Sequence, residues 1–182
     1  MKKALAFLLF ILSFGTAGAE NVVVFHDFHE LFYAVPQQLV LSNSSKVGTV
    51  GDVVYTCSGT NAKFNLAFTG AMRIAINLPS SDCEVVTTQF NNLSQIIFMP
   101  VTPDNIPSGV CDNIKIKLST DGSIWEEVPS DSITYRSGEI KAVFTPGNYY
   151  VKIYNTRSYR VSILQTKFYL VEENCNCFTY TP

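Results

Sequence analysis

Histidine is scarce in this chain of 182 residues, which contains only His26 and His29. Nucleophilic and general acid–base catalysis need a positioned base, and histidine is the commonest one. A Ser-His-Asp or Cys-His arrangement would therefore have to use one of these two residues. The motif G-x-S-x-G and the glycine-rich phosphate loop that ends in Lys-Ser/Thr are also missing. We therefore expect a protein that is not an enzyme and that needs no cofactor.

Basic residues and long apolar runs are scarce as well. The whole chain has 13 lysines and arginines against 15 aspartates and glutamates, and two of the lysines stand at the extreme N-terminus. This acidic balance disfavours binding to nucleic acid and to anionic membranes. Beyond residue 19 no apolar stretch approaches the roughly 20 residues that a membrane-spanning helix needs. We expect no nucleic-acid partner and no membrane span in the mature chain.

Residues 1–19 have the features of a secretory signal peptide. Two lysines are followed by an apolar run over residues 4–12 and by the small-residue ending Ala17-Gly18-Ala19. A charged start, an apolar centre and an A-x-A-like ending are the marks of a cleaved signal. We predict that residues 1–19 are removed and that residues 20–182 are secreted, periplasmic or displayed at the cell surface. The compact two-lysine start is typical of bacterial signals.

Cysteine is the residue type that export makes most informative, because disulfides persist in oxidising compartments. All five cysteines lie after the predicted cleavage point: Cys57, Cys83, Cys111, Cys175 and Cys177. Cys57 and Cys83 bracket two strand-like segments and are candidates to join them. Cys111 is then a candidate partner for Cys175 or Cys177, which lie two residues apart and compete on one face of a strand. The connectivity stays open, and an odd number leaves at least one thiol free, reactive or bonded to another chain.

A hydrophobic period of two residues dominates the chain after the signal segment. Apolar side chains alternate with polar or small ones in residues 63–68, 72–78 and 113–118. This period indicates half-buried strands with one face toward a core. No apolar period of 3.6 residues persists for three turns, and residues 27–33 are the best candidate for a single helical turn. The pattern predicts an all-β protein with little helix.

Turn-forming residues separate the predicted strands. Asp121-Gly122 is a strong hairpin signal, and Pro146-Gly147-Asn148 is expected to begin a strand that ends at Asn155. Many short strands with frequent turns predict a single antiparallel β-sandwich of jelly-roll-like type over residues 20–182. The alternative is two small sandwiches that separate near the longest irregular stretch, residues 100–111.

Part of the chain resembles a known class of sandwich domains. Residues 119–128 read S-T-D-G-S-I-W-E-E-V, which is similar to the hairpin S-x-D-G-x-x-W-x-x-V of discoidin-like jelly-roll domains. Residues 148–153 resemble a strand of that family and a strand of bacterial pre-peptidase C-terminal sandwiches, and residues 163–171 match the closing strand. The resemblance covers residues 113–172. It implies a jelly-roll sandwich with Trp125 in the core and a role in extracellular glycan or surface binding, but it transfers no binding residue.

The segment His26-Asp27-Phe28-His29-Glu30 is the densest cluster of polar ligands. On one helical turn His26 and His29 would share a face and chelate Zn or Cu, whereas on a strand they would face opposite ways. We expect a polar turn here and retain a metal-dependent activity at this pair as a third functional hypothesis. Two aspartate-rich loops are candidates for Ca²⁺, although a structural turn is the simpler interpretation of each. These loops are Asp104-Asn105 and Asp112-Asn113.

Tyr150, Lys152 and Tyr154 alternate with more apolar neighbours and form a candidate binding stripe. Exposed aromatic and cationic side chains suit a sugar or a protein surface, although tyrosine pairing across strands also stabilises sheets on its own. We predict an exported, non-enzymatic binding module that recognises a glycan or a protein surface. The alternative is a structural subunit of a surface assembly, such as a pilus or surface layer, that forms homo-oligomers or a disulfide-linked complex. In that case the strand from Asn21 to Phe25 would pair with a neighbour's sheet.

Overall fold

The computed structural model describes residues 21–34, 37–68, 72–101, 114–156, 158 and 160–172. The described part consists mostly of strands, and every strand pair in it is antiparallel. The elements in chain order are β1 (Asn21–Asp27), α1 (Phe28–Tyr33), β2 (Leu39–Ser42), β3 (Val47–Val50), β4 (Val53–Ser58), β5 (Lys63–Phe68), β6 (Met72–Leu78), β7 (Glu84–Thr87), β8 (Phe90–Val101), β9 (Ile114–Ser119), β10 (Glu126–Glu127), the 3₁₀ turn η2 (Ser130–Ser132), β11 (Ile133–Arg136), β12 (Glu139–Asn155) and β13 (Val161–Val171).

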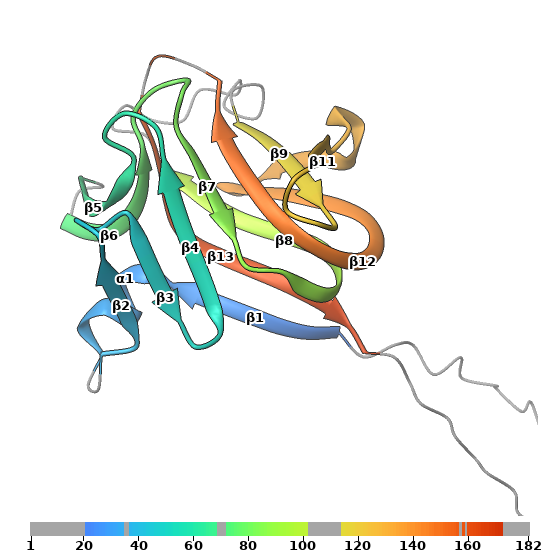
Figure 1. Ribbon diagram of the computed structural model, residues 1–182, viewed down its shortest axis with the longest axis horizontal. Helices are drawn as coiled ribbons and strands as arrows, with labels where there is room; N and C mark the ends of the chain where they lie inside the picture. The colour runs from blue at the N-terminus through green and yellow to red at the C-terminus, as the bar shows by residue number, and fades with distance from the viewer. Residues whose placement is uncertain are drawn as a thin grey trace, which may run out of the picture.

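The strands form two sheets that share the long strand β12 (Figure 1). Sheet A begins with the strand order β11–β12–β8–β13. The other edge of β13 pairs with β1 along one part and with β6 along another, and β6 also pairs with β5. Sheet B runs β2–β3–β4–β7–β12–β9–β10. The protein is therefore an all-β antiparallel sandwich with one short helix, as the hydrophobic period predicts.

The middle of β12 is where the chain passes from sheet A to sheet B. Its pairing with β8 shifts register between Val143 and Gly147 and again between Gly147 and Tyr149, and its pairing with β9 begins at Tyr150. Pro146 lies in this stretch and has no backbone N–H to donate to a ladder, which confines proline to edges and bulges. The sequence prediction of a turn at Pro146-Gly147-Asn148 is therefore wrong. These residues form an irregular bend within one strand of 17 residues.

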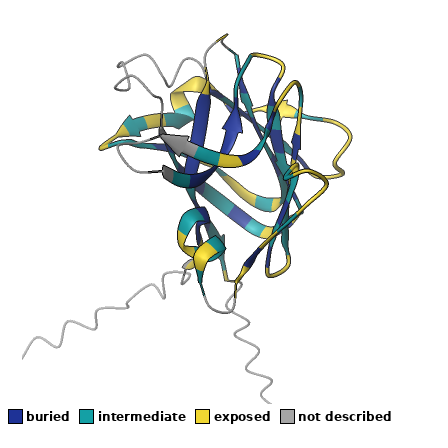
Figure 2. Cartoon of the chain, turned by 90° about the vertical axis from the view of Figure 1, so that its left-hand side faces the viewer, coloured by how far each residue is buried: buried dark blue, intermediate teal, exposed yellow. Residues whose placement is uncertain are grey.

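The core lies between the two sheets and takes its large apolar side chains from both. Figure 2 shows where the buried residues fall along the strands. Burial of this apolar surface is the main favourable term in folding. The largest fully buried side chains are Tyr55, Phe28, Phe98, Phe168, Leu39, Ile76, Leu78, Leu93, Ile96, Ile114, Ile116 and Ile140. The strand β6 departs from the half-buried pattern, because Ala75 and Asn77 on its second face are also buried. Asn77 is accommodated there by hydrogen bonds to the carbonyl oxygens of Asn65 and Ala75 and from the hydroxyl of Ser162.

The predicted helical turn over residues 27–33 is present as α1 and begins at a cap. Asp27 accepts hydrogen bonds at Oδ1 from the backbone N–H groups of His29 and Glu30, at 3.0 and 3.1 Å. Such a carboxylate satisfies backbone donors that a helix start leaves unpaired. Arg73 and Gln165 bond the other oxygen of Asp27. The helix therefore follows directly from the end of β1 at a defined position.

The strands on either side of residues 100–111 belong to the same two sheets. β8 ends at Val101, at the start of this stretch. It lies between β12 and β13, and both of these strands come after the stretch in the sequence. No helix of the described residues is long and apolar enough to cross a membrane. The predicted signal segment and the candidate Ca²⁺ loops at Asp104-Asn105 and Asp112-Asn113 lie outside the described residues.

Candidate ligand-binding surface

The C-terminal half of β12 presents the predicted binding stripe on the outer face of sheet B. Val151 and Ile153 are buried, whereas Tyr150, Lys152 and Tyr154 point outward and are partly exposed. This is the side-chain alternation of a strand with one face on the core. The structure therefore brings the three residues to one face, although their role in binding stays a prediction.

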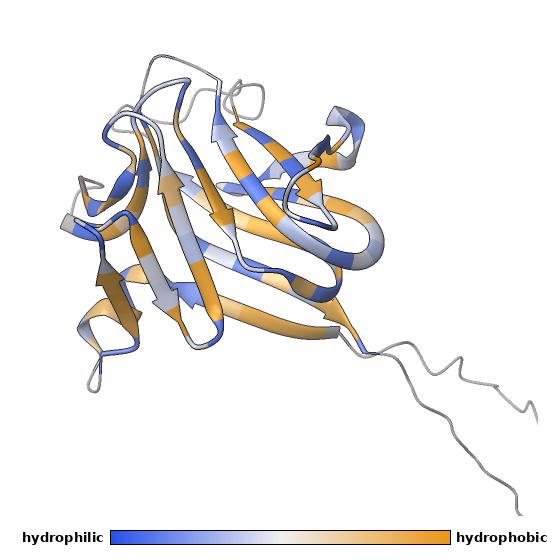
Figure 3. Ribbon diagram, in the orientation of Figure 1, coloured by the Kyte–Doolittle hydropathy of each residue, from blue (hydrophilic) through white to orange (hydrophobic). Residues whose placement is uncertain are grey.

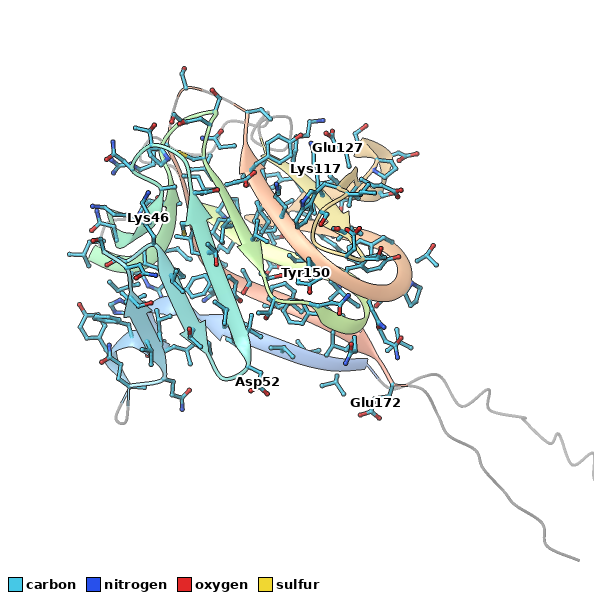
Figure 4. The ribbon with its side chains drawn as sticks, viewed as in Figure 1. Lys46, Asp52, Lys117, Glu127, Tyr150 and Glu172 are labelled. Carbon is cyan, nitrogen blue, oxygen red and sulfur yellow. The ribbon has the colours of Figure 1, made fainter. Side chains whose placement is uncertain are left out.

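Neighbouring strands add charged side chains and a tryptophan to this stripe. β9 pairs with β12 so that Lys117 lies opposite Lys152 and Lys115 lies opposite Tyr154. The Nζ atom of Lys152 is 4.5 Å from the centroid of the Trp125 ring. We call the resulting surface the aromatic face; it comprises Glu84, Lys115, Lys117, Trp125, Glu127, Tyr150, Lys152 and Tyr154. Figure 4 labels Lys117, Glu127 and Tyr150.

Glu127 connects the charges of the aromatic face. Its Oε2 accepts a hydrogen bond from the Tyr154 hydroxyl at 2.8 Å, and its Oε1 lies 3.1 Å from Lys115 Nζ. These contacts hold the pKa of Glu127 below its usual value, with the Tyr154 hydrogen bond as the largest cause. Burial and the neighbouring carboxylate raise the pKa of Tyr154 to about 12. At neutral pH the pair is therefore a phenol donor and a carboxylate acceptor.

The cations on this face also lie against its aromatic rings. Lys117 Nζ is 5.0 Å from the centroid of the Tyr154 ring, and Lys152 Nζ is 3.1 Å from Glu84 as well as over Trp125. Cation–π contacts and ion pairs of this kind orient long side chains that would otherwise move freely. The aromatic face is therefore an ordered array of rings, donors and acceptors on the outer face of sheet B.

Trp125 and Glu127 are members of this face that sequence reasoning missed. The discoidin-like resemblance implies that Trp125 is a core residue, and this is wrong: its side chain is partly exposed, and Val128 is the buried residue of the segment. The Asp121-Gly122 turn does produce the predicted hairpin, with Glu126 opposite Leu118. Its loop spans several residues instead of two, and Asp121 accepts three hydrogen bonds within it.

A cleft of about 480 Å³ borders the aromatic face. Its lining includes Glu126 and Glu127 from β10, the turn residue Asp121, and the rings of Phe144 and Tyr149 from β12. Glu127 therefore belongs to both the aromatic face and this cleft.

His26 and His29 do not share a helical face. His26 lies in β1 and is buried, with Nδ1 2.6 Å from the hydroxyl of Tyr55. His29 lies in α1, where its Nδ1 faces the backbone N–H of Ile74 at 3.3 Å. No group of three or more His, Cys, Asp or Glu side chains in the described part of the chain could hold a metal ion. The helical arrangement on which the Zn or Cu hypothesis depends is therefore not formed.

Cys57 and Cys83, the predicted disulfide partners, are free and buried thiols in the structure. Cys57 lies opposite Val85 in the β4–β7 pair. The sulfur of Cys83 is held by the Thr60 carbonyl oxygen at 3.3 Å and by Ser80 Oγ at 3.4 Å. The predicted staple is therefore absent here, although Cys57 lies in β4 and Cys83 immediately precedes β7, the strand that pairs with β4. Cys111, Cys175 and Cys177 lie outside the described residues.

Comparisons with known proteins add little to this description. No family model matches the chain, and no curated protein matches it. Among solved structures, CBM32-1 from a family 31 glycoside hydrolase of Clostridium perfringens is similar over 63% of this chain and 93% of that chain, with 13% sequence identity and a TM-score of 0.41. The class of the protein, an antiparallel β-sandwich, follows from its own strand pairing.

Proposed function

We propose that this protein is an exported binding module that holds a glycan on its aromatic face. The observation that carries the proposal is the grouping of Trp125, Tyr150 and Tyr154 with paired lysines and glutamates on the outer face of sheet B. A sugar ring has apolar C–H faces and a rim of hydroxyls. Aromatic rings match the first, and fixed donors and acceptors match the second.

The arrangement of charges supports a glycan in preference to a polyanion. Two of the three lysines of the face pair with carboxylates, Lys115 with Glu127 and Lys152 with Glu84. Paired charges give little net attraction for an anion, but each still supplies hydrogen bonds to hydroxyl groups. The bordering cleft offers a sugar chain a second binding position beside Glu127.

Trp125 supplies a direct test, because it is the only tryptophan in the chain. We expect its intrinsic fluorescence to change on titration with at least one member of a panel of neutral oligosaccharides. Calorimetry should then give an affinity that Tyr154→Ala and Trp125→Ala each weaken about tenfold or more, which corresponds to about 1.4 kcal/mol.

The matched control is Tyr33→Ala, which removes an aromatic ring that is 58% exposed on α1, away from the aromatic face. It should bind oligosaccharide as the unaltered protein does. No binding across the panel, or binding that survives both aromatic-face variants, would refute the proposal. Sequencing of the secreted protein's N-terminus tests export separately, with Glu20 as the expected first residue.

Assembly through β1 is a second candidate function. Val23 and Phe25 are 46% and 50% exposed, and β1 appears as a largely apolar strand in Figure 3. β1 pairs with β13 of its own chain, so the predicted donation of this strand to a neighbour would require it to leave its own sheet. An added strand at the other edge of β1 requires no such change. Sedimentation velocity tests this: a monomer at every concentration rejects assembly, and Val23→Lys should abolish any oligomer that forms.

A further inference from the structure

A second cleft opens at another end of the sandwich and has a volume of about 830 Å³. It lies between β1, the β3–β4 turn and the β7–β8 connection, so that Asp52 at the tip of the β3–β4 turn marks its rim (Figure 4). Its walls are mostly apolar. The apolar lining residues are Val24, Phe25, Leu31, Val50, Val53, Phe90 and Leu170. None of them belongs to the aromatic face, so the two sites are separate.

His26 is the buried polar side chain in the lining of this cleft, and it is only 5% exposed. Its Nδ1 lies 2.6 Å from Tyr55 Oη, which in turn lies 2.9 Å from Thr166 Oγ1. A phenol is a stronger acid than a neutral imidazole, so Tyr55 donates to Nδ1, and Thr166 donates to Tyr55. Burial lowers the pKa of His26 to about 4, so the ring is neutral at physiological pH. The one ring proton is therefore on Nε2.

The Nε2–H group of His26 has no hydrogen-bond partner within the described residues. Buried polar groups in folded proteins are almost always paired, because an unpaired buried donor is destabilising. The hydrogen bond to Tyr55 fixes the position of the imidazole ring, and His26 is part of the lining of the cleft. A ligand atom that accepts a hydrogen bond would complete its pairing.

The rim of the cleft indicates the charge of a suitable ligand. Its polar lining residues are Gln38, Asp52, Thr88, Gln89 and Asn91. Asp52 is the one charged side chain among the lining residues, and none of them is a lysine or arginine. Without a cation at the cleft, an anionic ligand would lose its hydration with no compensating charge. A neutral ligand loses much less hydration free energy on entering the cleft.

We propose that this cleft binds a neutral amphipathic small molecule, with an apolar body against Val53 and Phe90 and one carbonyl or hydroxyl oxygen that accepts from His26 Nε2–H. The cleft has the size and mixed lining of small-molecule sites, in which a few polar groups set the orientation of a mainly apolar ligand. This site is independent of the glycan proposal.

Nile red is a suitable probe, because it is a neutral aromatic dye with a carbonyl oxygen. We expect a saturable rise in dye fluorescence with one site per chain. Val53→Trp fills the cleft and should weaken dye binding at least tenfold, whereas Val143→Trp, at a position of sheet A that is 46% exposed, should leave it unchanged. His26→Phe keeps the ring and removes the donor, and the loss of one hydrogen bond should weaken binding about tenfold.

The unaltered protein provides a test that does not depend on variant folding. In a sample labelled with ¹⁵N-histidine, only two imidazoles contribute signals. Dye binding should shift the Nε2–H signal of His26. No saturable binding, binding that Val53→Trp leaves intact, or a bound state in which the His26 signal is unchanged would each overturn the proposal. Oligosaccharide titration of Val53→Trp keeps the two sites distinct, because the aromatic face should bind as before.

Discussion

The buried His26 makes the stability of this protein depend on pH in a window that lies mostly above the pKa values of ordinary carboxylates. In the folded state burial lowers the pKa of His26 from 6.5 to about 4. In the unfolded chain the ring is solvated and takes up a proton near pH 6.5. Between these two values the unfolded state binds more protons than the folded state, so the free energy of unfolding rises with pH. The stabilisation is fully present above pH 6.5 and is lost as the pH falls toward 4.

The difference between 6.5 and about 4, at about 1.4 kcal/mol for each pKa unit, amounts to about 3.5 kcal/mol, of which about 3 kcal/mol is lost by pH 4. This is a large part of the free energy of unfolding of typical domains, which is about 5–15 kcal/mol. Asp27, the adjacent residue, has its pKa held below 3.8 by hydrogen bonds from Gln165 and Glu30 and by Arg73, against the effect of burial. Its protonation therefore falls mainly below this window. Tyr55 stays neutral throughout, because burial raises its pKa.

Urea denaturation at pH 7, 6, 5 and 4 measures this effect. The unaltered protein should lose about 3 kcal/mol of unfolding free energy across the series. His26→Phe cannot be protonated, so its stability should change much less over the same range, even though it starts lower at pH 7. If His26→Phe shows the same slope as the unaltered protein, the buried imidazole is not the cause and the reasoning is refuted.

Three further predictions concern Tyr55, Gly59 and Cys57. Tyr55→Phe removes a hydroxyl that joins two buried polar groups and should lower the unfolding free energy by about 2 kcal/mol in urea. Gly59→Ala should lower the unfolding free energy by about 3 kcal/mol or more, because φ is +98° and the new Cβ collides with the backbone oxygen of Asp82. The control is Gly138→Ala, at φ +82° with open space around it, which should lower the unfolding free energy by about 1 kcal/mol in the same assay. Burial raises the pKa of the Cys57 thiol to about 12, so iodoacetamide should not alkylate Cys57 in the folded protein at pH 8. In urea without reductant the thiol should be alkylated, and peptide mapping measures both results. A Cys57 that is not alkylated in urea would instead indicate a disulfide.

The local structure of this protein is largely determined by neighbouring residues. The alternation of Tyr150, Lys152 and Tyr154 with Val151 and Ile153 depends only on the two-residue repeat of a strand, and the observed burial follows it. Likewise α1 occurs where the sequence predicts a single helical turn. In both cases the decisive interactions lie within a few residues along the chain.

Tertiary structure alone decided which strands meet and where clefts form. The passage of β12 between sheets depends on its simultaneous pairing with β8, β7 and β9, which no local pattern contains. Trp125 looks like a core residue by its hydrophobicity, yet the fold of the β9–β10 loop places it beside Lys152. The relay of His26, Tyr55 and Thr166 joins residues separated by up to 140 positions. Sequence predicts the faces of strands because their period is local, whereas a site built between strands exists only when the whole sandwich has closed.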